Sequence, residues 1–278
     1  MVMKIYYYEA GAWSQALELA IAETGYDEDE VEWERVNLRS GANFDPKYLK
    51  LNPLGLIPIC EVDGKIVRDS VNVAKEILQR APGGAGELSA EHAKLIEQVH
   101  DASRDPKLFG LYPFDAADRE EKASGEVFQF IKGRQTALEK YPAEAPELAE
   151  FYKGKLEDNT VLYDFYQGKL DAAGEDKVFA QGKAVWASAG ELVHGPLTAA
   201  LKTASPFLAG DKPGEADYHV IVWLARAISL SGTEQGQPAD VGLPNLHKRI
   251  GGPEIDPAVA KYWETWRERE SFTENEVW

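Results

Sequence analysis

Apolar and polar residues alternate along the first eighty positions in a way that predicts strands and helices in turn. Residues 4–8 predict a short aromatic strand. Residues 13–24 predict a helix whose apolar side chains recur at helical spacing until Gly25 stops it. Residues 31–38 predict a second strand that carries many charges. The chain is therefore expected to begin with a strand, a helix and a second strand.

The plainest β-hairpin signal comes next. Residues 57–62 and 65–68 predict two strands, and the Asp63–Gly64 pair between them favours a tight turn. Residues 70–79 then predict a helix with its apolar residues on one face. The complete order, β-α-β followed by β-β-α, predicts an α/β domain over residues 1–80.

Strand signals nearly vanish after this point. Residues 81–86, APGGAG, are too rich in glycine and proline to continue either neighbour, and we expect a linker over residues 81–91. Prolines separate the later segments, since proline cannot continue a helix. Residues 92–278 therefore predict an all-helical domain. Helical periodicity covers residues 90–104, 119–140, 146–170, 183–202, 217–230 and 257–267.

Composition narrows the classes of function. The 278 residues are 44% hydrophobic, which suffices for a full core, and 47 acidic against 30 basic residues give a formal charge of −17. A surface this negative repels phosphate backbones, so we expect no nucleic acid partner. No apolar run is long enough to cross a bilayer, and the first residues lack a basic leader. We therefore expect no membrane association and a cytoplasmic location.

Cysteine and histidine usage limits redox and metal chemistry. Cys60 is the single cysteine, which excludes an internal disulfide and suits a reducing compartment. Because it falls within a predicted core strand, we expect Cys60 to be buried. The five histidines show no metal-ligand spacing, so we expect no bound metal. Reactive sulfur would have to come from another molecule.

The run LNPLGLIPICEVDGKIVRDS, from Leu51 to Ser70, carries the most specific signal. Pro58 stands at the start of a predicted strand, where its missing N–H is normally disfavoured, and a cis Ile57–Pro58 bond resolves this conflict. Such a bond leaves the N–H and C=O of Ile57 free to pair with an extended peptide. Ser70 opens the next helix, where its hydroxyl and the free N–H groups favour a carboxylate. One peptide that bears a carboxylate would fit both places.

This run resembles the signature of the cytosolic glutathione S-transferase superfamily, NPxGxVPxL followed by DG and ES. The chain has Ile57 where valine is usual and Asp69 where glutamate is usual. The resemblance implies a thioredoxin-like α/β N-terminal domain and an all-α C-terminal domain, with glutathione as cosubstrate. It implies that Ile57 and Pro58 hold the cysteinyl backbone, while Asp69 and Ser70 hold the γ-glutamyl end. The cis-proline and the helix cap would also persist in a relative that had lost glutathione.

The reactive centre is expected between the first strand and the first helix. KIYYYEAGAWS resembles the bacterial beta class of the family, in which a YY pair is followed by GACS. Trp13 therefore stands at the position of the class's cysteine and is expected to contact glutathione. A hydroxyl must then activate the thiol. Ser14, at the helix start, is favoured by geometry and helix dipole. Tyr7 is the rival, because the resemblance places it where the tyrosine-type classes keep their activating residue. Tyr7 and Tyr8 cannot both point at one sulfur, since neighbouring residues of a strand face opposite sides.

Several other residues have two interpretations. His100 lies in LIEQVHDASRDP, which resembles the first C-terminal helix of the beta class, where a histidine reaches toward the glutathione thiol. The alternative for His100 is an interhelical hydrogen bond in the core. Arg39 and Lys47 could each neutralise the glycyl carboxylate or simply be solvated. Asp217 resembles the family's helix-capping residue and is expected to be structural.

The resemblance implies a glutathione transferase that conjugates the thiolate of glutathione to a small apolar or aromatic electrophile, as in detoxification. We expect the second pocket among the C-terminal helices, with Tyr112, Phe114, Trp186 and Trp223 as its wall or as plain core. The segment between Gly110 and Lys202 is longer than is usual in the family, which implies elongated or additional helices near that pocket. Ether cleavage or isomerisation would use the same residues, and a non-catalytic ligand-binding or assembly module is the alternative from another class. The family also implies a homodimer.

Overall fold

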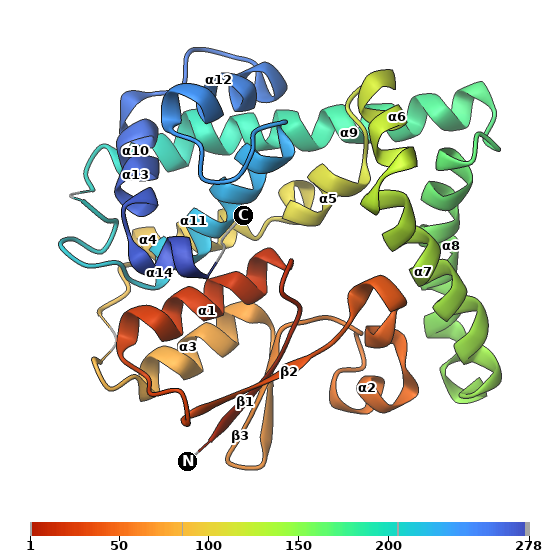
Figure 1. Cartoon of the computed structure of the whole chain (residues 1–278), viewed down its shortest axis with the longest axis horizontal. Coiled ribbons are helices and arrows are strands. Elements are labelled where there is room, and N and C mark those ends of the chain that lie inside the picture. The colour runs from red at the N-terminus through yellow and green to blue at the C-terminus, as the bar shows by residue number, and fades with distance from the viewer. Residues whose placement is uncertain (1, 85, 205, 276–278) are drawn as a thin grey trace.

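Figure 1 shows the computed structural model, which describes residues 2–84, 86–204 and 206–275. A four-stranded mixed sheet forms the centre of the N-terminal half. In spatial order its strands are β2 (Val31–Arg35), β1 (Met3–Tyr7), β3 (Ile59–Val62) and β4 (Lys65–Arg68). β1 runs parallel to β2 and antiparallel to β3, and β3 runs antiparallel to β4.

Two helices pack on the sheet. α1 (Ala12–Thr24) and α3 (Ser70–Arg80) contribute buried apolar residues to the same core as β1 and β3. Leu17 of α1, Ile77 of α3 and Ile5 of β1 are all completely buried in it. The expected thioredoxin-like arrangement is confirmed.

The connection from β2 to β3 is helical, which the periodicity did not predict. It contains η1 (Leu38–Ser40), η2 (Ala42–Phe44) and α2 (Pro46–Leu51). The predicted strand over residues 31–38 therefore ends at Arg35. Asp45 starts α2 by accepting a hydrogen bond from the Lys47 N–H, with Pro46 at the first helical position.

The rest of the described chain is helical, as expected, apart from an isolated bridge between Phe207 and Gly210. Its main helices are α4 (Ala90–Val99), α5 (Pro106–Leu111), α6 (Ala116–Ser124), α7 (Glu126–Lys140), α8 (Ala149–Tyr166), α9 (Ala172–Leu192), α10 (Thr198–Leu201), α11 (Glu215–Leu230), α12 (Ala239–Ile250), α13 (Pro257–Arg267) and α14 (Glu270–Glu274). A π-helical segment, Val193–Leu197, joins α9 to α10. No helix in the described part of the chain is long and apolar enough to cross a membrane.

Several predicted helix bounds were wrong. The helix predicted over residues 90–104 ends at Val99, because His100 takes the C-cap position. The helix predicted over residues 119–140 is two helices, since the backbone of Gly125 is extended and breaks it. α12 was not predicted because Pro244 lies inside it.

α11 is the central element of the second half, and 12 of its 16 residues are buried. It packs against α1 of the N-terminal half and against α4, α5 and α12. Asp217 lies three residues inside the helix and accepts a hydrogen bond from the Gly214 N–H at 3.0 Å. The structural capping role expected for Asp217 is confirmed.

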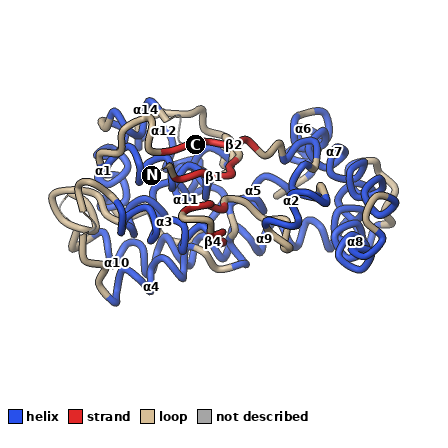
Figure 2. Tube along the Cα trace, turned by 90° about the horizontal axis from the view of Figure 1, so that it is seen from below, coloured by secondary structure: helices blue, strands red, loops and turns tan. Residues whose placement is uncertain are grey.

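Helices α6, α7 and α8 extend away from α11, and α7 and α8 lie against the connection between β2 and β3 (Figures 1 and 2). We refer to residues 116–166, which span these helices, as the helical arm. Phe44 and Leu49 share a buried cluster with Leu138 and Tyr152 of the arm. The Tyr152 hydroxyl donates to the Phe44 carbonyl at 3.0 Å. The long segment after Gly110 thus supplies additional helices that pack on the N-terminal half of their own chain.

Close backbone contact makes this packing sensitive to one glycine. A Cβ added to Gly133 of α7 would overlap the carbonyl oxygen of Arg39 in η1. We predict that Gly133→Ala lowers the free energy of unfolding by about 1–3 kcal/mol, because α7 must move away from η1. The matched control is Gly154→Ala in α8, where an added Cβ meets nothing. That change should be neutral or stabilising by up to about 1 kcal/mol.

Urea unfolding of both variants provides the measurement. Equal stability of Gly133→Ala and Gly154→Ala would contradict this account of how the arm is held.

Candidate functional site

The predicted peptide-binding edge lies where the chain enters β3. The Ile57–Pro58 bond is cis, as expected. Side chains from α2 and η2 fix the preceding loop: the carbonyl of Leu56 accepts from the Tyr48 hydroxyl, and the carbonyl of Gly55 accepts from Asn43, each at 2.7 Å. The backbone N–H and C=O of Ile57 have no hydrogen-bond partner among residues 2–84, 86–204 and 206–275. A rigid loop therefore presents one unpaired donor and one unpaired acceptor.

A second set of unpaired donors lies at the start of α3. Asp69 has a left-handed φ of 75° and is the N-cap, since its carboxylate accepts from the Val71 N–H at 3.0 Å. Ser70 is the first residue of the helix, and neither its N–H nor its hydroxyl has a partner within the described residues. Because Ile59 pairs with Arg68, this helix start lies beside Pro58. The two predicted binding places are adjacent.

Ser14 of α1 is 1% exposed, and its oxygen accepts a hydrogen bond from the Tyr8 N–H at 3.2 Å. An added Cβ at Gly11 would lie 3.3 Å from Ser14 Oγ and 3.8 Å from Ile57 Cδ1. The side chains of Ser14 and Ile57 therefore both border Gly11. The Ser14 hydroxyl proton is not used in the bond to Tyr8.

The two tyrosines at the end of β1 have different surroundings. Tyr7 packs edge-on against Trp33, with ring centroids 5.1 Å apart. Burial, followed by the nearby Glu18 carboxylate, raises the pKa of Tyr7. The Tyr8 hydroxyl instead accepts a hydrogen bond from Arg39 at 3.0 Å. Arg39 also forms an ion pair with Glu126 at the start of α7.

Trp13, His100 and His219 form a contact between the two halves of the chain. The Trp13 indole stacks on the His100 imidazole with centroids 3.7 Å apart. His100 Nε2 lies 3.0 Å from Nδ1 of His219 in α11, so His100 makes the interhelical hydrogen bond that was one of its two interpretations. The other ring nitrogen of His219 is buried and has no partner within the described residues.

Burial keeps both imidazoles neutral. It lowers the pKa of His100 to about 4, although the carboxylates of Asp69 and Asp105 oppose the shift. Burial also lowers the pKa of His219 far below its usual value, and the nearby Lys75 acts in the same direction.

Arg226 was missed by sequence reasoning. It lies on α11 and donates to the Ala10 carbonyl at 2.8 Å and to Gln15 Oε1 at 3.3 Å, in the loop and helix that follow β1. Burial lowers the pKa of Arg226 to about 10, and Tyr8 opposes the shift. The signal in the sequence was a lone arginine in the apolar run VIVWLARAISL.

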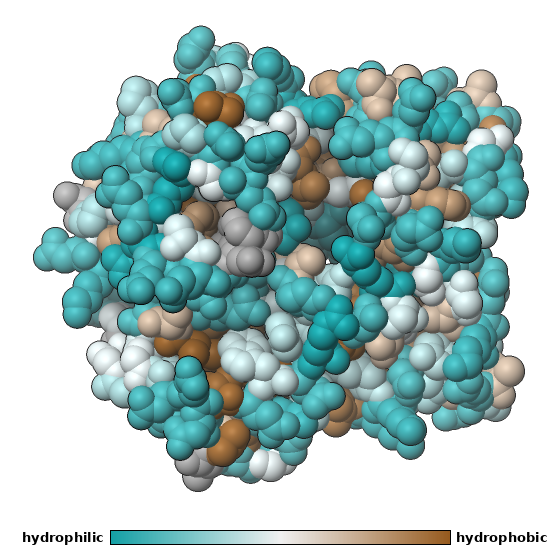
Figure 3. Space-filling view, viewed as in Figure 1, coloured by the Kyte–Doolittle hydropathy of each residue, from teal (hydrophilic) through white to brown (hydrophobic). Residues whose placement is uncertain are grey.

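The aromatic wall expected for a second pocket is only partly in place. Trp186 and Trp223 are 1% and 0% exposed, so they are core residues and do not line an open pocket. Tyr112 and Phe114 remain half-buried. Cys60 is completely buried, and burial raises the pKa of its thiol to about 12, as expected for a packing residue. Figure 3 shows a hollow in the surface between the arm and the remaining helices.

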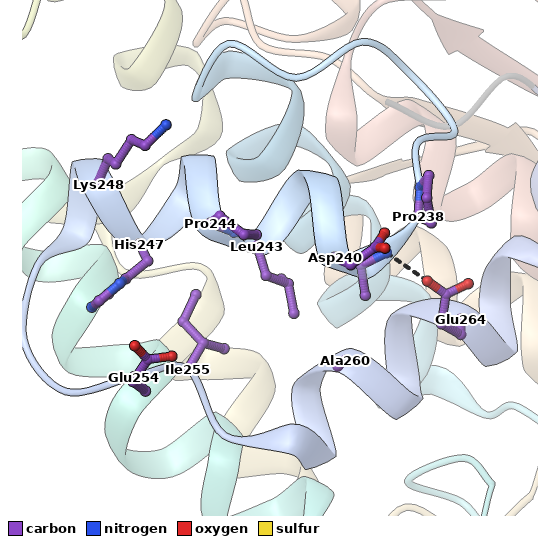
Figure 4. A pocket seen from close by; sticks show the side chains of 11 residues that line it. Pro238, Asp240, Leu243, Pro244, His247, Lys248, Glu254, Ile255, Ala260 and Glu264 are labelled. Carbon is purple, nitrogen blue, oxygen red and sulfur yellow. Dashed lines mark hydrogen bonds between the residues drawn. The ribbon is translucent and has the colours of Figure 1, made fainter.

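A separate groove of about 850 Å³ lies between α12 and α13 (Figure 4). Leu243, Ile255 and Ala260 supply its apolar surface, and Glu264 accepts a hydrogen bond from the Ala239 N–H there. Neither Ile57 nor any other residue of the predicted peptide-binding edge lines it. The groove is therefore distinct from the site described above.

Comparisons with known proteins bear on the same residues. The family model described as "Glutathione S-transferase, N-terminal domain" matches residues 10–79. Over 269 residues the chain is 24% identical to Glutathione S-transferase TCHQD of Arabidopsis thaliana. The aligned region covers 95% of this chain and 92% of that protein.

Solved structures match nearly the whole chain. Beta-etherase LigF from Sphingobium sp. strain SYK-6 gives a TM-score of 0.59 at 15% identity, covering 99% of this chain and 98% of that one. A theta class glutathione S-transferase from the citrus canker pathogen Xanthomonas axonopodis pv. citri, with glutathione bound, gives a TM-score of 0.56 at 12% identity, covering 100% and 98%. At these identities the likeness shows the fold alone.

The buried histidine pair predicts a pH-dependent stability. The folded state holds His100 and His219 neutral, whereas the unfolded chain binds protons below about pH 6.5. Stability should therefore fall as the pH drops from 6.5 toward 4, by up to about 1.4 kcal/mol per pH unit for each histidine. Replacing both with phenylalanine should flatten this dependence, as measured by urea unfolding between pH 7.5 and 5.

The control is His92→Asn in α4, the helix that His100 caps. This variant should keep the wild-type dependence of stability on pH. A double variant with the wild-type slope would show that other groups set the acid sensitivity.

Proposed function

Because the chain belongs to the cytosolic glutathione transferase superfamily, we propose that it binds glutathione and transfers the thiolate to a small apolar or aromatic electrophile. One observation carries the proposal. Two adjacent sets of polar groups, at Ile57 and at Ser70, have no partner among the described residues, and an extended peptide with a carboxylate would pair with both sets.

Glutathione has the groups that these positions require. In the proposed pose its cysteinyl backbone pairs with Ile57 as an added strand. Its γ-glutamyl carboxylate accepts from the N–H and hydroxyl of Ser70, where the helix dipole of α3 favours an anion. The Asp69 carboxylate then faces the γ-glutamyl ammonium group. Its sulfur is directed toward the start of α1, with Trp13 and His100 as further contacts.

We propose Ser14 as the group that activates the thiol. Its oxygen already accepts from the Tyr8 N–H, so its proton is available to a thiolate. The raised pKa of Tyr7 makes that phenol a weaker hydrogen-bond donor. Trp13 cannot act as a nucleophile, so the chemistry depends on the sulfur of glutathione.

Substitution of the two hydroxyls separates these roles. Ser14→Ala should raise the pKa of the bound thiol toward its free value of about 8.5. It should lower kcat/KM near neutral pH by about ten- to a hundred-fold, or roughly 1.4–2.8 kcal/mol. Tyr7→Phe should change neither quantity. Ultraviolet titration of the bound thiolate is the measurement, and an unshifted pKa in Ser14→Ala with a raised one in Tyr7→Phe would reverse the assignment.

Binding and turnover must also be measured on the wild type. Calorimetric titration with glutathione, followed by conjugation to 1-chloro-2,4-dinitrobenzene, separates an enzyme from a non-catalytic relative. Binding with turnover supports the proposal. Binding without turnover would indicate a ligand-binding module. A protein that shows no binding and no turnover would overturn the proposed function. The expected homodimer and cytoplasmic location remain predictions.

A further inference from the structure

Two cations of the helical arm, Arg134 and Lys155, have no anionic partner among the residues that the structure describes. Arg134 of α7 lies over the Phe44 ring at 4.6 Å and near the Phe130 ring at 5.3 Å. It makes no hydrogen bond or ion pair with any residue that the structure describes. Burial lowers the pKa of Arg134 to about 10.

Lys155 of α8 likewise lies beside an aromatic ring without an anionic partner in the described part of the chain. Its ammonium lies 5.7 Å from the centre of the Phe151 ring and forms no hydrogen bond or ion pair within the described ranges. Burial lowers its pKa, and the positive charges of Arg134 and Lys107 lower it further, against the opposing carboxylate of Asp158. Unpaired cations that repel one another are unusual in a chain whose formal charge is −17.

The two cations are linked to the peptide-binding edge through aromatic rings. Phe44 and Phe151 contact each other edge-on, with centroids 6.3 Å apart. An added Cβ at Gly55 would lie 3.2 Å from the tip of Phe151, so this ring adjoins the loop two residues before Ile57. The aromatic pair thus connects Arg134 and Lys155 to the loop that presents Ile57.

The direction of a bound peptide brings its far end to these cations. The start of α3 adjoins Pro58, and in the proposed function it receives the γ-glutamyl end. The cysteinyl residue then lies at Ile57, and the chain continues past Leu56 and Gly55, at about 3.3 Å per residue. Arg39, one candidate for the glycyl end, is already bonded to Tyr8 and Glu126.

We propose that Arg134 and Lys155 form a carboxylate-binding site, through which the helical arm takes part in ligand recognition. The carboxylate is the glycyl end of glutathione or an acidic group on the second substrate. This proposal rests on the proposed function. It gives the arm a role beyond packing, since an arginine and a lysine beside aromatic rings suit a carboxylate on a flat or extended ligand.

The test uses the full-length protein with Arg134→Gln and Lys155→Met. Lys132→Gln in α7 and Lys153→Met in α8 are controls, because both lysines are exposed and lose the same charge. Calorimetry compares glutathione with its glycine carboxamide. Steady-state kinetics compare 1-chloro-2,4-dinitrobenzene with 4-chloro-3,5-dinitrobenzoate, which carries a carboxylate.

If the glycyl end is the ligand, both variants should weaken the binding of glutathione by roughly ten-fold or more. Their affinity for the carboxamide should stay that of the wild type. If the second substrate supplies the carboxylate, KM should rise for the benzoate alone. The carboxylate site would be overturned if the variants changed the binding of glutathione and its carboxamide equally and the KM of both aromatic substrates equally. Such a result, together with a loss of thermal stability, would indicate a structural role for the two cations.

Failure of the proposed function would look different, because the wild type would then not bind glutathione or its carboxamide. In that case binding of 4-chloro-3,5-dinitrobenzoate by itself decides the matter. Tighter binding of the benzoate than of the neutral compound, lost in Arg134→Gln and Lys155→Met, would support the carboxylate site. No such preference would overturn it.

Discussion

The carboxylate of Asp217 is completely buried, and the arrangement of both halves of the chain depends on the donors that surround it. Three backbone N–H groups, those of Leu208, Ala209 and Gly214, donate to it at 2.8–3.1 Å, and the Tyr262 hydroxyl donates at 3.0 Å. Burial raises the pKa of Asp217, and these hydrogen bonds oppose the shift. A buried carboxylate is tolerated only with such partners. The network therefore fixes where α11 begins and how it meets α13.

From that start, α11 directs two more polar side chains toward the N-terminal half. His219 meets His100, whose ring stacks on Trp13, and Arg226 holds the carbonyl of Ala10. These contacts reach the start of α1 and the loop before it, where the thiol of a bound peptide would arrive in the proposed pose. The loop that leads to Ile57 is held by the hydrogen bonds of Asn43 and Tyr48, while the backbone groups of Ile57 have no partner in the described part of the chain. The proposed ligand-binding edge is thus fixed in place with its own donor and acceptor unused.

Sequence reasoning succeeded where a local pattern determines the structure. The cis bond before Pro58, the hairpin of β3 and β4 and the cap formed by Asp217 each depend on residues close together in the chain. It failed where the structure depends on distant contacts. Nothing near Arg226 in the sequence indicates that it reaches Ala10, and the contact of Gly133 with η1 joins segments about ninety residues apart. The backbone edge of the candidate site was therefore predictable from the sequence. The place of Arg226 and the position of the helical arm were not.

The most direct test of the central claim is a crystal structure with glutathione bound. We expect the cysteinyl backbone to pair with Ile57 and the γ-glutamyl carboxylate to lie at Ser70, with the sulfur at the start of α1. Glutathione bound only elsewhere, for example in the groove between α12 and α13, would contradict the account.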